Sequence, residues 1–419
     1  MKNKIILGIN SDILIIGILF FIFGFVTWLG SILIPYLKIA CELTTFESYL
    51  VAFSFYISYS IMAIPSSWVL RKTGSKKGMS LGLFIMTLGT LLFIPAALTR
   101  LYPLFLFGLF TQGAGLTILQ SASNPYITKL GPAESAAKRM SIMGISNGIA
   151  GVMAPIILGA IILSDADLLE QKLSVLSATE RIAELEALAS RVIFPYISMM
   201  IMLIVLALLI YFSALPELDT DEEDEATTAA NENKKSILQF PHLLLGALTV
   251  FLYVGVEVIA VDTIFSYATS QGVAVSQATY FASFTILNML VGYVIGIICI
   301  PRFINQNRAL KLSAIAGVAF ALIALFTEAL TSVIFISLLG LANALIWPSI
   351  WPLAINGLGR FTKTGSSLLI MAIGGGAVLP LVYGRIAEDL NPQAAYWMVI
   401  PCYLFILFYA TSANKIRTR

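Results

Sequence analysis

Apolar segments long enough to cross a bilayer recur along all 419 residues of the chain. A membrane-spanning helix needs roughly 20 consecutive apolar residues. Segments of this kind fall at about 12–40, 46–70, 79–99, 102–128, 138–163, 194–214, 242–268, 276–300, 309–329, 331–357, 365–387 and 394–412. Only 11% of the residues are charged and 58% are hydrophobic, whereas a soluble domain carries about 25% charged residues. The sequence therefore predicts an all-α integral membrane protein with twelve transmembrane helices in a lipid bilayer.

The twelve segments form two groups of six. Between the groups lies LPELDTDEEDEATTAANENKKS at 215–236, a charged stretch of low hydrophobicity that is typical of a flexible linker. We expect an N-terminal six-helix half at 1–215, a cytoplasmic linker at 216–241 and a C-terminal six-helix half at 242–419.

The distribution of lysine and arginine predicts the orientation, because cytoplasmic loops carry an excess of both. With both termini inside, 19 of the 25 Lys and Arg residues lie on the cytoplasmic side. We therefore expect a multi-pass protein with both termini and the linker in the cytoplasm. The segment 164–191 is then an outer loop that contains a short helix.

The two groups also repeat sequence features. Three positions recur with an offset of 231, namely Tyr49, Phe53 and Arg71 as Tyr280, Phe284 and Arg302. A Gly-x3-Pro-x3-Gly pattern in the fifth segment, at 151–159, recurs in the eleventh at 376–384. Two parallel six-helix repeats are typical of major facilitator transporters, whose site lies between the halves near the membrane midplane. We expect that fold, with two pseudo-symmetric halves.

Four stretches carry a closer resemblance: FGFVTWLGSILIPYLK at 23–38, SFYISYSIMAIPSSWVLRKTG at 54–74, GLTILQSASNPYITKLGP at 115–132 and GSSLLIMAIGGGAVLPLVYG at 365–384. They resemble the fucose permease family of bacterial sugar:cation symporters, and the Gln of LQSASNPY is similar to the glucose/galactose branch. The resemblance implies symport of glucose or galactose, or of fucose, with H⁺ or Na⁺ across a bacterial inner membrane.

The chain also departs from that family. Fucose permeases carry an Asp in the first span and a Glu in the fourth, both tied to proton and sugar. Here these positions hold Ser31 and Gln120, and an Asn usual before the Asp is Gly30. If the chain couples to a cation, the resemblance then implies that the charge lies elsewhere. The seventh span, with Glu257 and Asp262, offers the alternatives.

Glu257 and Asp262 lie inside an apolar run, LYVGVEVIAVDTIFSY at 252–267. Acids within a bilayer are costly and usually mark a pathway or a site. Five residues apart, they point about 140° apart on a regular helix, so they share a site only if the span bends, which Gly255 would allow. In one interpretation Asp262 with Ser266 binds the cation (as the metal ligand, if it is Na⁺) while Glu257 accepts sugar hydroxyls. In the other, one acid is only a structural partner of a neighbouring helix. Which acid carries the ion stays open, and we favour Asp262.

Amide and tryptophan side chains within the spans are the candidates for further sugar contacts. Amides donate and accept hydrogen bonds without a charge, and a tryptophan face suits the apolar face of a pyranose. The candidates are Trp28, Gln120, Asn124, Asn147, Asn288, Asn343, Trp347, Trp351 and Asn356. The alternatives are hydrogen bonds between helices for the amides and an interfacial belt for the tryptophans.

Nothing in the sequence favours an enzyme, because it has no phosphate-binding glycine loop and no His/Cys nucleophile pair. We expect no cofactor beyond the coupling ion, H⁺ or Na⁺, and no nucleic acid partner. The expected partners are a monosaccharide, a cation and the bilayer, and the expected state is a monomer. Two other functions stay open: a non-transporting sensor or scaffold with a transporter fold, and a multidrug exporter.

Overall fold

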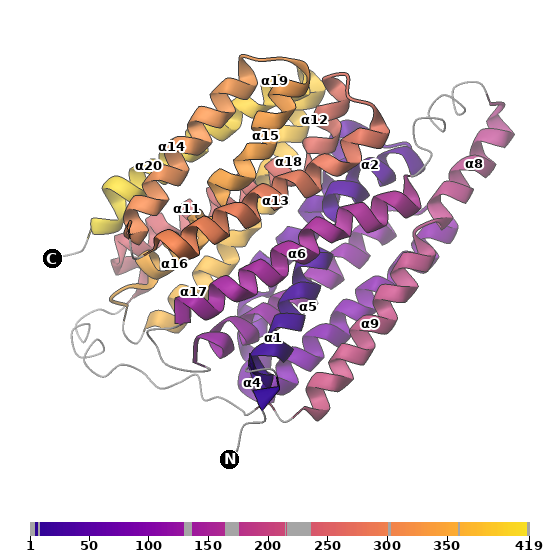
Figure 1. Ribbon diagram of the computed structural model, residues 1–419. Helices are drawn as coiled ribbons and strands as arrows, with labels where there is room; N and C mark the ends of the chain where they lie inside the picture. Colours follow the sequence, from indigo (N-terminus) through magenta and orange to yellow (C-terminus); the bar gives the residue numbers. More distant parts are fainter. Residues whose placement is uncertain are drawn as a thin grey trace.

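The computed structural model describes residues 5–6, 9–129, 136–163, 176–213, 215, 236–300, 303–358 and 361–416, and it is almost entirely helical (Figure 1). Within these residues, eleven helices are long and apolar enough to cross a membrane. One of them, α4 (Leu50–Thr99), is two helices joined at Gly74, whose φ of 77° is not helical. Counting α4 as two spans gives the twelve that the sequence predicts. Most of the expected linker lies outside the described residues.

The first half begins with a two-residue antiparallel ribbon in which Ile6 pairs with Ile9. Its elements are β1 (Ile5–Ile6), β2 (Ile9–Asn10), α1 (Ser11–Thr27), α2 (Gly30–Ala40), α3 (Thr45–Ser48), α4, α5 (Tyr102–Lys129), α6 (Ala136–Ile162), α8 (Ala178–Ser190) and α9 (Ile193–Phe212).

The second half has the same order of spans with more interruptions. Its elements are η2 (Ile237–Gln239), α11 (Pro241–Asp262), α12 (Ile264–Ser270), α13 (Val275–Cys299), α14 (Gln306–Leu325), α15 (Ala329–Asn343), α16 (Ile346–Ile355), α17 (Thr362–Met371), η4 (Ala372–Gly374), α18 (Gly375–Asp389), α19 (Pro392–Ala395), η5 (Tyr396–Met398), α20 (Val399–Thr411) and η6 (Ala413–Lys415).

Four spans are discontinuous at membrane depth. The breaks lie between α1 and α2, between α11 and α12, between α15 and α16, and at η4. Residues at three of them, Leu29, Thr263 and Ala344, are at most 2% exposed. Irregular backbone at membrane depth is tolerated only where it is buried in protein or lines a cavity. The breaks therefore lie in the interior of the bundle, where a site can form.

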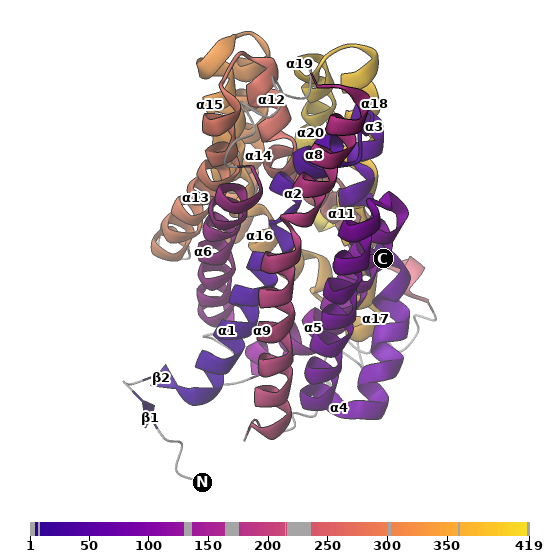
Figure 2. The same ribbon diagram turned by 90° about the vertical axis from the view of Figure 1, so that its right-hand side faces the viewer.

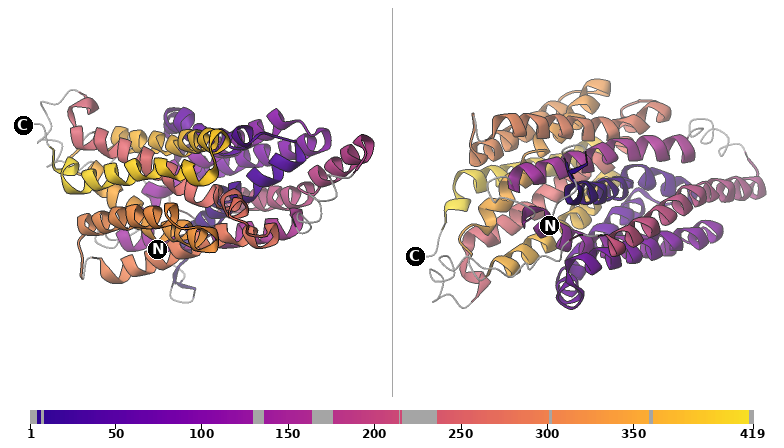
Figure 3. Two further views of the ribbon diagram at one scale, coloured as in Figure 1. Left: turned by 90° about the horizontal axis from the view of Figure 1, so that it is seen from above. Right: turned by 60° about the horizontal axis from the view of Figure 1, so that its bottom comes forward.

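The two halves lie side by side (Figure 3) and meet where α2 lies against α11 and α12, and along two seams. In one, α4 lies against α17 and α18, and the Ser60 hydroxyl donates to the Met371 carbonyl at 2.8 Å. In the other, α6 lies against α13, and the Ser283 hydroxyl donates to the Val152 carbonyl at 2.8 Å. The seams thus join spans 2 and 11 and spans 5 and 8, positions that correspond in the repeat.

One end of the bundle carries α3, α8, α12 and α19, and we call it the α8 end (Figure 2). There the rings of Tyr49, from the first half, and Tyr383, from α18, meet edge to face with centroids 5.7 Å apart. Both side chains are at most 1% exposed. This aromatic contact closes the seam between spans 2 and 11 at the α8 end.

The loops of the α8 end are tied together by charge. Glu42 pairs with Arg181 at 2.8 Å and with Arg100 at 3.6 Å. The short helix expected within 164–191 is present as α8 and begins with a capping box, in which Ser177 donates to Glu180. These hydrogen bonds, from the Ser177 hydroxyl and then its backbone N–H, lower the pKa of Glu180 below its ordinary value.

Glycines allow several helices to approach closely, as expected where lipid provides no hydrophobic drive for helix association. A Cβ added to Gly340 of α15 would overlap the Thr285 carbonyl of α13. A Cβ on Gly17 of α1 would lie 3.8 Å from its nearest neighbour, the Met143 side chain, which is an ordinary contact.

This contrast predicts different outcomes for two matched substitutions. Gly340→Ala forces α13 and α15 apart, and overpacking of this kind costs about 1–3 kcal/mol. Gly17→Ala adds a methyl group without a clash and favours the helix. We expect a thermal unfolding midpoint several degrees lower for Gly340→Ala in detergent, and an unchanged or higher one for Gly17→Ala. Equal midpoints would contradict the close approach at Gly340.

Candidate functional site

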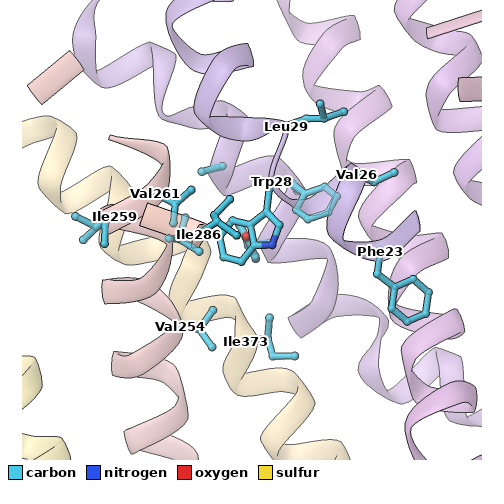
Figure 4. Close-up of a cluster of buried hydrophobic side chains, with 14 of the residues drawn as sticks. Phe23, Val26, Trp28, Leu29, Val254, Ile259, Val261, Ile286 and Ile373 are labelled. Carbon is cyan, nitrogen blue, oxygen red and sulfur yellow. The ribbon is translucent and has the colours of Figure 1, made fainter. Parts of the chain in front are cut away.

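The break in span 1 places Trp28 between the two halves. Figure 4 shows its indole among apolar side chains that include Val261 and Ile286 of the second half. The indole N–H donates to Asn147 Oδ1 of α6 at 3.3 Å, and Asn147 Nδ2 donates to the Phe20 carbonyl at 3.4 Å. The structure therefore brings together Trp28 and Asn147, two of the residues that the sequence predicts for the site.

Asp262 is the last residue of α11 and is 1% exposed. Neither of its carboxylate oxygens has a hydrogen-bond partner in the structure. A Cβ built on Gly30, the first residue of α2, would lie 2.7 Å from Asp262 Oδ2. The carboxyl group of the second half thus lies directly against the break in span 1.

A small interior cavity adjoins this contact. Its volume of about 10 Å³ is roughly what one water molecule requires. Its walls come from spans 1, 2, 4 and 6 of the first half and from Asp262 of the second. Five of its lining residues are polar: Thr27, Tyr56, Gln112, Tyr196 and Asp262.

Glu257 lies on another side of α11. The Tyr253 hydroxyl, one turn earlier, donates to Glu257 Oε1 at 2.5 Å. The Tyr253 ring lies 6.4 Å from that of Trp347, which lies 5.3 Å from that of Trp351. The acid and the two predicted tryptophans thus form one group, joined by a tyrosine.

The two acids of span 7 do not share a site. Helix α11 is continuous through both of them and ends at Asp262, so the break at Thr263 comes too late to bring them together. Helix α11 does not bend at Gly255. The Leu379 side chain packs against this glycine instead. Asp262 therefore faces the first half, while Glu257 faces the tryptophan group.

The amides of span 4 lie in two environments. Gln120 and Asn124 are half-buried on α5, and the structure shows neither with a hydrogen bond to another described residue. Gln112, two turns earlier, is buried and donates to Thr90 at 3.1 Å. Gln120 and Asn124 thus keep donors and acceptors that a polar ligand could use.

The remaining predicted residues lie apart from these groups. Asn288 donates to the Ser337 carbonyl at 3.2 Å, and Asn343, fully buried, accepts from Tyr403 at 2.8 Å. Asn356 is exposed at the end of α16. Ser266 is half-buried in α12, beyond the break. The contacts of Asn288 and Asn343 are of the kind that hold helices together.

Sequence reasoning missed three residues that border the acids. Tyr253 could have been found, because residues four apart lie on one face of a helix. Tyr196 and Thr27 come from spans 6 and 1, and only the tertiary structure brings them to the cavity that Asp262 also lines. Within the described part of the chain, no group of three or more His, Cys, Asp or Glu residues could hold a metal ion.

The buried hydrogen bond between Tyr403 and Asn343 predicts that Asn343 has a structural role. Tyr403→Phe removes the donor and leaves the buried Asn343 oxygen unpaired, in addition to its Nδ2, which has no partner in the structure; the loss costs about 1–3 kcal/mol. The double variant Tyr403→Phe/Asn343→Leu removes both polar groups, a change that can be nearly neutral. We expect a thermal unfolding midpoint that falls in the single variant and largely recovers in the double variant. A midpoint that falls further in the double variant would contradict this structural role for Asn343.

Comparisons with known proteins agree with this architecture. The sequence matches the Major Facilitator Superfamily over residues 16–380. It is 34% identical over 401 residues to a glucose/galactose transporter of Brucella abortus, covering 95% of this chain and 93% of that one. It is 29% identical over 405 residues to the L-fucose-proton symporter of Escherichia coli, covering 96% and 92%.

Solved structures give the same answer. The crystal structure of the Major Facilitator Superfamily transporter FucP in the outward conformation matches with a TM-score of 0.74 and 29% identity, over 95% of this chain and 97% of that one. The resemblance that the sequence predicts is confirmed. This chain therefore belongs to the Major Facilitator Superfamily.

Proposed function

We propose that the chain is a secondary active hexose transporter that moves glucose or galactose, or fucose, together with a cation, H⁺ or Na⁺. The relatives named as a glucose/galactose transporter and an L-fucose-proton symporter support the sugar class and the symport. The observation that carries the coupling is the buried Asp262 carboxyl, which lies between the halves without a hydrogen-bond partner.

The physical argument for coupling is the cost of an isolated charge. A carboxylate that is buried and unpaired costs several kcal/mol. Binding of a proton or of Na⁺, which prefers oxygen ligands as other hard cations do, removes most of that cost. Binding of the cation and reorientation of the halves are then linked, because Asp262 of one half lies against Gly30 of the other. This is the link that symport by alternating access requires.

The proposed sugar site lies beside this cation site. Glu257, Trp347 and Trp351 supply an acceptor and two aromatic faces from the second half. Gln120 and Asn124 supply amides from the first half that make no hydrogen bond to another described residue. Such a site has mainly apolar and aromatic walls with a few polar groups that fix the ligand, as is usual for small-molecule sites.

The proposed orientation places the α8 end outside a bacterial inner membrane and both termini in the cytoplasm. Arg100 and Arg181, which the charge count assigns to the outer side, both pair with Glu42 and so lie at one end of the bundle. A monomer is the proposed functional unit.

Transport can be tested directly in proteoliposomes. We expect saturable uptake of labelled glucose, galactose or fucose, and accumulation above equilibrium when an inward Na⁺ or H⁺ gradient is imposed. Asp262→Asn should abolish accumulation and leave some sugar exchange, because a neutral side chain cannot bind and release the cation. Glu257→Gln should raise the half-saturating sugar concentration and keep coupling, because an amide accepts fewer hydrogen bonds than a carboxylate.

Asp389→Asn is the matched control for Asp262→Asn. Asp389 is exposed at the end of α18 and pairs with Arg385 at the surface, where ion pairs contribute little, so accumulation should be unchanged. Full uphill uptake in Asp262→Asn would contradict coupling through this carboxyl. Absence of saturable uptake of all three sugars would instead favour a sensor or scaffold.

The tryptophan group predicts an effect on sugar affinity. Trp347→Ala removes one aromatic face from the proposed site, and we expect the half-saturating sugar concentration to rise about tenfold, which corresponds to about 1.4 kcal/mol. The control is Trp68→Ala, since Trp68 is 56% exposed. Equal half-saturating concentrations for the two variants in exchange assays would rule out Trp347 as a sugar contact.

A further inference from the structure

Two helix breaks meet at the boundary between the halves. Span 1 breaks before Gly30, and span 7 breaks after Asp262. A Cβ on Gly30 would lie 2.7 Å from Asp262 Oδ2 and 3.1 Å from its Cγ, so a larger residue at position 30 would push the Asp262 carboxyl away. The absence of a side chain at position 30 thus leaves the space in which this carboxyl lies.

The cavity beside this contact contains a second buried polar group without a partner. Tyr196 of α9 is 1% exposed, and its hydroxyl, like both oxygens of Asp262, has no hydrogen-bond partner in the structure. Tyr196 and Asp262 line the same cavity. A buried polar group costs free energy unless it is paired, so the two groups point to a small polar or cationic ligand that satisfies both.

The charge of the surroundings selects a cation. No lysine, arginine or histidine lines the cavity. Tyr49, at the start of span 2, and Tyr56 of span 2 interact electrostatically with Asp262, and Tyr196 of span 6 lines the same cavity. A tyrosine side chain is neutral or negative, so none of the three can balance the carboxylate, whereas a mobile cation can.

Ser266 is not part of this cavity. It lies four residues after Asp262, but in α12, beyond the break at Thr263, and it is absent from the cavity wall. The other residues that line the cavity come from the first half, among them Thr27, Gly30 and Gln112. The ligands are thus divided between the halves rather than placed along one helix.

We infer that the coupling cation binds between the two halves, on the Asp262 carboxyl of span 7 and the oxygens of Thr27 and Tyr196 of the first half, in space that Gly30 leaves open. This inference rests on the proposed symport and specifies its cation site. The site is complete only when the two halves are in contact where Gly30 meets Asp262. The cation is therefore enclosed when the halves close there.

The test compares four variants in proteoliposomes. The sugar is whichever of labelled glucose, galactose and fucose the wild type accumulates. One arm varies Na⁺ against choline at fixed pH, and the other varies pH without Na⁺. The measured quantity is the cation concentration that gives half-maximal uptake. In parallel, intrinsic tryptophan fluorescence is titrated with NaCl or with acid in the absence of sugar, which reports cation binding without transport.

We expect Gly30→Ala to raise the half-maximal cation concentration at least tenfold, because the added methyl displaces the carboxyl. Tyr196→Phe removes the hydroxyl and keeps the ring, and it should raise the half-maximal cation concentration several-fold. This variant keeps the test decisive if Gly30→Ala folds poorly. Gly159→Ala is the matched control, since its Cβ would lie 3.6 Å from the nearest atom, and Ser266→Ala should also stay within about twofold of the wild type. The fluorescence titrations should shift by the same factors.

A tenfold rise in Ser266→Ala, with Gly30→Ala and Tyr196→Phe within twofold, would overturn this inference and leave the proposed symport standing. Conversely, the expected shifts in the fluorescence titrations, without accumulation of any of the three sugars, would support the cation site and contradict the proposed transport. No response of the wild type to either cation in both assays would overturn the two together.

Discussion

The interior of a bilayer offers no hydrogen-bond partner to a peptide group, so each backbone donor and acceptor at that depth has to be satisfied within the protein. This constraint makes every span a helix. It also confines irregular backbone to places that other helices cover, and the buried residues Leu29, Thr263 and Ala344 at the breaks obey it. The same interior is where the two halves meet. The parts of the backbone that are free to depart from a helix are thus the parts that can form a binding site.

Charge follows a similar rule in this protein. Glu257 and Asp262 lie well inside a span of the second half, and each is accommodated in a different way. Glu257 accepts a hydrogen bond from Tyr253 on its own helix. Asp262 has no such partner and faces the other half. A group that is satisfied locally can stay as it is while the halves move, whereas a group at the boundary experiences every change in their separation. This difference separates the roles that we propose for sugar binding and for coupling.

The sequence was sufficient for the spans, because a run of about 20 apolar residues has few other uses. It was also sufficient to predict two six-span halves, a short helix where α8 lies, and the position of Glu257 and Asp262 inside span 7. It could not reveal that Gly30 and Asp262 touch, since they lie 232 residues apart and no local pattern encodes the contact. The sequence also could not decide whether α11 bends at Gly255, which it does not. That glycine makes room for Leu379 of α18. The sequence alone does not distinguish a glycine that permits a bend from one that permits close packing.

The edge-to-face contact of Tyr49 with Tyr383 bears on how the molecule divides its time between conformations. Both rings are at most 1% exposed, and burial of one large apolar side chain contributes about 1.5–3 kcal/mol. Tyr383 keeps its contact with Tyr396 of its own half when the rings part, so admitting water at the α8 end exposes only part of the pair and costs on the order of the burial of one ring, about 1.5–3 kcal/mol. A difference of that size corresponds to a population ratio of roughly 10 to 1 up to about 100 to 1. Without ligands the protein then favours the state in which the α8 end is closed. Ligands that bind the open state better offset this preference and so speed the transport cycle.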